Sequence, residues 1–152
     1  MRLLPALLLA LVVTATAAPL PFPKPPWMDP DLKAMQGDWE VVEKSCGGLL
    51  MRQDDVTLRI RGDRMMFLVE GDVRTVWAVT TKPVAEPKRM DLRCVGGTLT
   101  GSIGLASLAV YRIDGDRLTV ADVDAESGKD RPTDFEGKRR GEWLTTYKRK
   151  VP

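Results

Sequence analysis

From Asp29 to Trp39 the chain reads DPDLKAMQGDW, and this stretch decides how the rest is interpreted. Asp29 is a favourable N-cap, Pro30 suits the first helical position, and Gly37 suits the position just after a helix. The stretch therefore predicts a short helix of about two turns that ends at Gly37. A strand containing Trp39 follows it directly. We expect the helix to close one end of the domain.

The rest of the chain is a series of short β-type runs separated by turn residues. Val56 to Arg61 alternates apolar and polar side chains, which is the pattern of a half-buried strand. Glycine-containing tight turns join several neighbouring runs, as hairpins require. The pattern predicts an all-β antiparallel meander of about eight strands. An up-and-down barrel is the simplest closure because it leaves no exposed edge, and a two-sheet sandwich is the alternative. The expected strands are 39–45, 56–61, 64–70, 73–81, 89–94, 107–113, 117–122 and 142–149.

The N-terminal segment predicts export. Residues 1–17 combine Arg2, an apolar run and a small-residue end, which is typical of a cleaved secretory signal peptide. The apolar run is too short to span a bilayer, and no later segment predicts a transmembrane helix. Residues 18–30 form a proline-rich linker, and residues 31–150 form the barrel domain. We therefore expect a secreted or periplasmic protein with no transmembrane segment after cleavage.

Composition argues against several classes of function. The net charge is +2, with basic and acidic residues interspersed, so nothing indicates nucleic-acid binding. Histidine is absent, which removes the histidine-based catalytic pairs and the commonest zinc ligand. Asp122, Asp124 and Glu126 lack the spacing of a calcium loop, so we interpret them as solvated turn residues. No catalytic residue, metal site or cofactor is predicted.

Two cysteines, Cys46 and Cys94, are candidates for a disulfide, because an oxidising compartment favours one. Cys94 shares a strand face with Leu92 and Met90, so it should point inward. Cys46 has the opposite parity to Trp39 and should point outward, unless a bulge resets the strand. Parity therefore weakens the expected bridge. A reduced Cys94 inside a pocket is the alternative.

Large apolar side chains could line a pocket for a small hydrophobic molecule. The other interpretation, which we favour, is that they fill the interior, as in many small barrels. By parity with Trp39, Glu43 would be the first polar group in any cavity. The candidate pocket residues are Trp39, Glu43, Met65, Phe67, Trp77, Met90 and Tyr111.

Three motifs in order resemble a lipocalin-like domain family of unknown function, which is expanded in planctomycete bacteria and often follows a signal peptide. The motifs are MQGDWEVV at residues 35–42, YRIDGDRL at 111–118 and RPTDF at 131–135. The resemblance implies a lipocalin-like barrel and supplies no catalytic residues. It also implies that a basic residue near the end of the last strand packs over the first-strand tryptophan. Arg149 is the positional match, with a structural role alongside Gly37 and Trp39.

Three functions remain open from the sequence. The first is an exported binding or interaction module, holding a small hydrophobic ligand or contacting an envelope protein. The second is a cavity enzyme that uses Cys94 or Glu43, although we expect no enzyme. The third is a structural surface domain without a ligand.

Overall fold

The computed structural model describes residues 28–52 and 55–151. The expected signal peptide and most of the proline-rich linker lie outside the described residues. The elements agree with the expected strands to within two residues at every boundary, and β2 is an addition. In chain order they are α1 (Pro30–Met35), β1 (Gly37–Cys46), β2 (Leu49–Leu50), β3 (Val56–Arg61), β4 (Arg64–Val69), β5 (Asp72–Lys82), β6 (Arg89–Gly96), the 3-10 turn η1 (Thr100–Ser102), β7 (Ala106–Asp114), β8 (Arg117–Asp124), the 3-10 turn η2 (Ala125–Ser127) and β9 (Glu142–Arg149).

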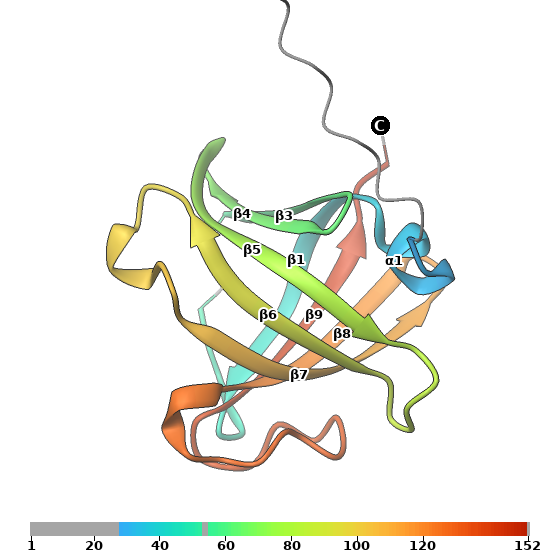
Figure 1. Ribbon diagram of the computed structural model, residues 1–152, viewed down its shortest axis with the longest axis vertical. Helices are drawn as coiled ribbons and strands as arrows, with labels where there is room; N and C mark the ends of the chain where they lie inside the picture. Colours follow the sequence, from blue (N-terminus) through green and yellow to red (C-terminus); the bar gives the residue numbers. More distant parts are fainter. Residues whose placement is uncertain (1–27, 53–54, 152) are drawn as a thin grey trace, which may run out of the picture.

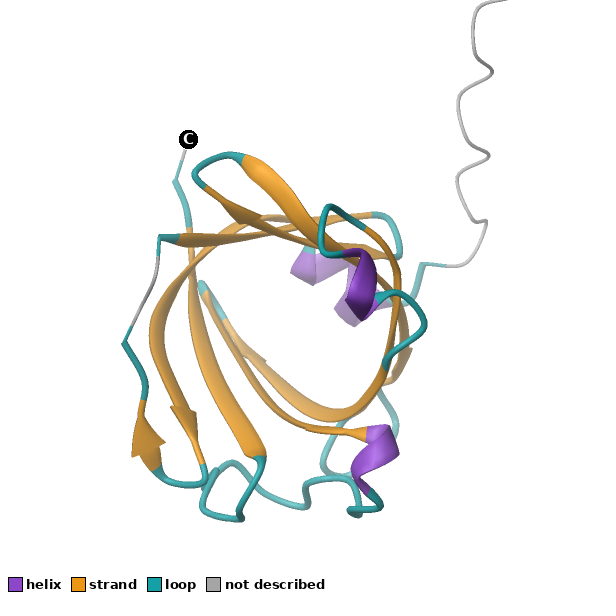
Figure 2. Ribbon diagram, turned by 90° about the vertical axis from the view of Figure 1, so that its left-hand side faces the viewer, coloured by secondary structure: helices purple, strands orange, loops and turns teal. Residues whose placement is uncertain are grey.

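The strands form a closed antiparallel barrel. From β3 to β9 each strand pairs with the next along the chain, and β1 pairs with both β3 and β9. Figure 2 shows the strands curving into a closed ring. The expected up-and-down barrel is confirmed, and the sandwich alternative is wrong, because the β1–β9 pairing removes the sheet edges. Among the described residues, no helix has the length and apolar character needed to cross a membrane.

Helix α1 lies across one end of the barrel (Figure 1). The Asp29 side chain caps the helix by accepting a hydrogen bond from the Leu32 N–H at 2.9 Å, as the sequence predicts. Leu32 and Met35 are buried against the core. The Tyr111 hydroxyl donates to the Asp31 carboxylate at 2.9 Å, which ties the helix to β7. We call this the closed end, and the end that carries β2 and η1 the open end.

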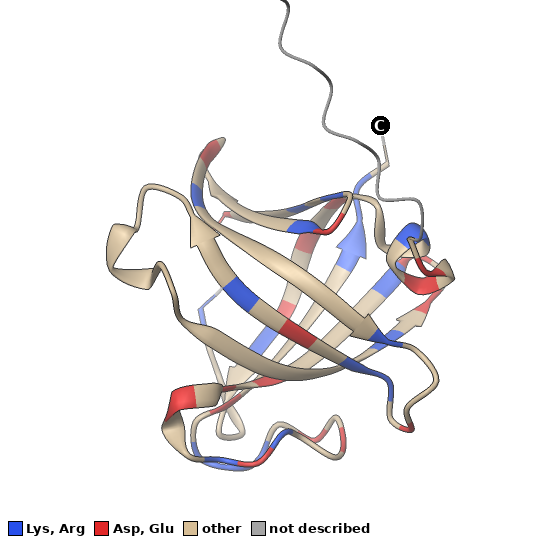
Figure 3. Cartoon of the chain, in the orientation of Figure 1, with Lys and Arg blue, Asp and Glu red and all other residues tan. Residues whose placement is uncertain are grey.

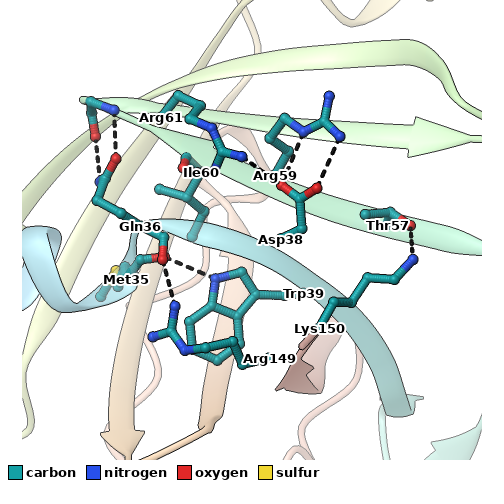
Figure 4. Close-up of polar contacts among 11 residues, drawn as sticks. Met35, Gln36, Asp38, Trp39, Thr57, Arg59, Ile60, Arg61, Arg149 and Lys150 are labelled. Carbon is teal, nitrogen blue, oxygen red and sulfur yellow. Dashed lines mark hydrogen bonds and ion pairs between the residues drawn. The ribbon is translucent and has the colours of Figure 1, made fainter. Parts of the chain in front are cut away.

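Trp39 and Arg149 hold the closed end together (Figure 4). Trp39 is fully buried, and its indole N–H donates to the Met35 carbonyl at 2.8 Å. The Arg149 guanidinium lies 4.1 Å from the centre of the Trp39 ring and donates to the carbonyls of Ala34 and Gln36. The stacking expected of Arg149 is therefore present. It joins the last strand to the first strand and to the helix.

Gly37 is required where the helix meets β1. Its φ is +128°, a conformation that side chains rarely allow. A Cβ at this position would lie 2.9 Å from a guanidinium nitrogen of Arg149. Glycine therefore permits both the turn and the close approach of Arg149.

The segment 125–141 leaves β8 at the open end and packs along the outer surface of β6 and β7. Arg131 donates to the carbonyls of Met90 and Ala109, both at 2.7 Å, and pairs with Asp91. Arg112 lies 5.0 Å from the centre of the Phe135 ring, which holds this segment against β7. Elsewhere basic and acidic side chains are mixed along the strands (Figure 3), so no single-sign surface stands out.

Candidate functional site

The barrel interior contains a cavity of about 210 Å³. It exceeds the ~150 Å³ of an engineered apolar cavity that binds benzene, and it is smaller than the ~300–1,000 Å³ of drug-sized pockets. The interior is therefore not packed solid, contrary to the interpretation that we favoured from the sequence. The cavity is lined by Leu58, Met65, Phe67, Thr75, Trp77, Leu92, Ser107, Val120, Asp122 and Tyr147.

Aromatic and aliphatic side chains make up most of the cavity wall. The Trp77 indole N–H donates to the Thr75 hydroxyl oxygen at 2.9 Å, which fixes the orientation of the ring. Phe67 comes from the neighbouring strand β4, where it pairs with Thr75. Flat, oriented rings of this kind suit the apolar body of a small ligand.

Asp122 contributes the one carboxylate among the described residues of the cavity wall. It lies on β8 beside Trp143 of β9, and Leu118, Val120 and Asp122 share the inward face. The Ser107 hydroxyl lies 2.8 Å from the Asp122 carboxylate and 2.9 Å from the Val123 carbonyl. Our interpretation of Asp122 as a solvated turn residue is wrong, because β8 runs to Asp124 and carries Asp122 inside the barrel.

Burial raises the pKa of Asp122 to about 6. The hydrogen bond from Ser107 and the charge of Lys44 oppose this increase, and the charge of Glu142 adds to it. Asp122 keeps some accessible area because it faces the cavity, although the surrounding strands enclose its carboxyl group. Tyr147, also in the wall, has its pKa raised by burial and by the charge of Asp122.

A register shift in β1 moves Glu43 out of the interior. Val41 pairs with Tyr147 and Lys44 pairs with Thr145, so the pairing shifts by one residue between Val41 and Glu43. Beyond the shift, Lys44 takes the inward face and Glu43 is exposed. Glu43 is therefore not a cavity group. The expectation was wrong because it assumed a regular strand.

Lys44 lies beside the cavity rather than in its wall. Its ammonium nitrogen is 4.8 Å from the centre of the Trp143 ring, a cation–π distance. It lines a smaller adjoining pocket together with Arg52, and the two pockets share Phe67 and Tyr147.

The expected disulfide is absent, because Cys46 and Cys94 are both free. The same register shift turns Cys46 to the inward face, where it pairs with Trp143 of β9. Cys94 lies on β6, and three strands separate β1 from β6 around the barrel. At ~4.8 Å between adjacent strands, the two cysteines are too far apart for a bridge. Cys94 is 1% exposed and does not line the cavity.

The structure thus divides the expected pocket residues. Met65, Phe67 and Trp77 line the cavity, whereas Trp39, Met90 and Tyr111 are buried in the core. The polar members of the wall were missed: Thr75, Ser107, Asp122 and Tyr147. The alternation of Leu118, Val120 and Asp122 was a readable signal for one of them.

Most of the large apolar side chains that are exposed in the described residues lie in two segments at the open end. Leu49, Leu50 and Met51 lie in and after β2, and Val95, Leu99 and Ile103 lie around η1. Among residues 28–52 and 55–151, no group of three or more cysteine, aspartate or glutamate side chains is arranged to hold a metal ion.

Comparison of the chain with family models, with curated proteins and with solved structures finds no match. The described residues form a closed β-barrel with a mostly apolar internal cavity, whose described lining includes one carboxylate, that of Asp122. The resemblance to the lipocalin-like family stays a prediction from its three motifs.

Proposed function

We propose that this chain is an exported binding protein that holds a small, mostly apolar molecule inside its barrel. The observation that carries the proposal is the cavity, which has oriented aromatic rings in its wall and a few convergent polar groups. Pockets of this composition are the usual place for a ligand in a protein without other site features. Helix α1 covers the closed end, so we expect the ligand to enter from the open end.

The size of the cavity limits the ligand. At about 210 Å³, it accommodates a molecule somewhat larger than benzene but not a long lipid chain or a sterol. We therefore expect a compact ring compound or a short-chain compound. The exposed apolar side chains at the open end would favour its approach from an apolar surface.

A titration with n-propylbenzene tests the cavity. We expect saturable binding to the wild-type chain by calorimetry, and loss of binding in Val120→Phe, because the added ring fills the cavity. Val84→Phe is the matched control, since Val84 is 98% exposed and its substitution leaves the cavity unchanged. Equal binding to both variants, or no binding to the wild type, would contradict the proposal.

Export has its own test. Expression of the full chain in a bacterial host should place a shortened protein in the exported fraction, cleaved near residue 17. Native mass spectrometry of that fraction, compared with the denatured spectrum, would reveal any ligand carried from the host. An uncleaved chain that stays in the cytoplasm would contradict export without affecting the binding proposal.

A further inference from the structure

Asp122 differs in charge from every other member of the cavity wall. The other described lining residues are apolar or carry neutral hydroxyl groups, so Asp122 is the one member of this described set that brings a formal charge to the ligand space. Among the described residues, no basic side chain lies within 4 Å of its carboxylate. A buried carboxylate without a counter-charge is costly, so its presence here needs an explanation.

The hydrogen bonds around Asp122 leave the ionised form short of a donor. The Ser107 hydroxyl has one proton and two acceptors in reach, the Asp122 carboxylate and the Val123 carbonyl. When Asp122 is protonated, it donates to Ser107, and Ser107 donates to Val123, so both acceptors are satisfied. When Asp122 is ionised, the single Ser107 proton can serve only one of the two acceptors, so the other acceptor has no donor. A donor from a ligand would restore the balance.

The charged groups around Asp122 are few. Lys44 on β1 attracts the carboxylate from beyond ion-pair distance and is held over the Trp143 ring. Glu142 on β9 is 1% exposed, repels Asp122 and pairs with Arg139. Tyr147 is a neutral phenol at physiological pH, and burial raises its pKa further. None of these groups supplies Asp122 with a direct cationic partner.

We propose that the cavity ligand is a small amine whose ammonium group binds the Asp122 carboxylate and whose apolar body contacts Trp77 and Phe67. This inference rests on the proposed function and specifies the chemistry of its ligand. An ammonium group supplies both the positive charge and the missing proton donor. The aromatic rings of the wall suit the apolar remainder and also attract a cation. A carboxylate ligand would instead meet like charge.

Three probes of matched size separate the possibilities: phenethylamine, n-propylbenzene and phenylacetate. Because a charge-assisted hydrogen bond contributes more than a neutral contact, we expect phenethylamine to bind roughly 10- to 100-fold more tightly than n-propylbenzene near pH 7.5. Phenylacetate should bind more weakly than either. Calorimetric titration of the full domain measures all three affinities.

Substitutions locate the effect. Asp122→Asn should abolish the preference for phenethylamine while binding of n-propylbenzene persists. Asp72→Asn is the matched control, because Asp72 is an exposed carboxylate at the start of β5 and lies outside the cavity wall. Lys44→Met provides an independent readout that keeps Asp122 intact. Removal of the nearby positive charge should strengthen binding of phenethylamine several-fold and leave n-propylbenzene unchanged.

The failures are distinguishable. If n-propylbenzene binds and phenethylamine binds no better, the amine inference is overturned and the cavity proposal stands. A preference that survives Asp122→Asn, or tighter binding of phenylacetate, also overturns it. If none of the three probes binds, the amine inference and the proposed function fail together.

Discussion

Asp122→Asn should change the dependence of stability on pH in a way that isolates one carboxyl group. The folded protein raises the pKa of Asp122 to about 6 from an ordinary value of 3.8. The folded state therefore holds the proton more tightly than the unfolded chain. Stability from this group is fully present below about pH 3.8 and is lost as pH rises through about 6.

The magnitude follows from the shift. The pKa of Asp122 rises from 3.8 to about 6 on folding. At ~1.36 kcal/mol per pKa unit, this lowers the free energy of unfolding by ~3 kcal/mol once Asp122 is ionised in both the folded and the unfolded state. About 1 kcal/mol of this is lost by pH 4.5, and the remaining ~2 kcal/mol is lost between about pH 4.5 and 7.5. Asparagine does not titrate, so the free energy of unfolding of the variant, relative to that of the wild type, should increase by ~2 kcal/mol over that interval.

Urea unfolding of both proteins at a series of pH values measures this difference. Subtraction of the two stability curves cancels the titration of every other carboxyl group. A difference that stays constant to within ~0.5 kcal/mol from pH 4.5 to 7.5 would refute the assignment. A change of opposite sign, in which the variant becomes less stable relative to the wild type as pH rises, would also refute it. The first result would mean that Asp122 is solvated or paired.

Three further predictions concern the frame that holds the cavity. Arg149→Met should lower the free energy of unfolding, measured by urea unfolding, by ~2–3 kcal/mol, because it removes the hydrogen bonds to Ala34 and Gln36 and the contact with Trp39. An effect below ~0.5 kcal/mol would contradict the role of this contact. Gly97→Ala should cost ~3 kcal/mol or more, because φ is +119° and a Cβ would lie 2.2 Å from the Arg74 carbonyl oxygen. Gly101→Ala, which meets no atom within 4 Å, is its control and should stay within ~0.5 kcal/mol. Without reductant, a thiol reagent should label both cysteines after denaturation but not Cys94 in the native protein; an unlabelled denatured chain would show that a bridge forms.

Local signals in the sequence predicted the barrel well. Alternating apolar residues and glycine turns define each strand and hairpin within a few residues of chain, so neither depends on distant contacts. The helix also depends on local chemistry, because Asp29 and Gly37 set its two ends. Closure through the β1–β9 pairing followed from the need to cover both edges.

The errors arose where distant strands decide the outcome. The register shift after Val41 carries no glycine or proline signal, yet it reverses the faces of Glu43, Lys44 and Cys46. The bridge to Cys94 failed because separation around a closed barrel is set by strand order, which a cysteine count does not contain.

Asp122 was missed for a different reason. Its parity with Val120 was visible in the sequence, but charged residues are rarely buried without a partner, so a solvated turn was the natural interpretation. The cavity beside Ser107 makes the inward position possible, and side-chain volumes summed over several strands create that cavity. A charged residue on the inward face of a predicted barrel strand is therefore a useful signal for an internal site.

An NMR titration of the wild-type domain with n-propylbenzene, followed at the tryptophan indole N–H signals, tests directly whether the barrel interior binds a ligand. The Trp77 indole lies in the cavity wall, whereas the Trp39 indole is bonded to Met35 in the core near the closed end. If the barrel interior is a ligand site, the Trp77 signal should shift saturably with little change at Trp39. No saturable shift at Trp77, or equal shifts at both indoles, would contradict the claim that the barrel interior is a ligand site.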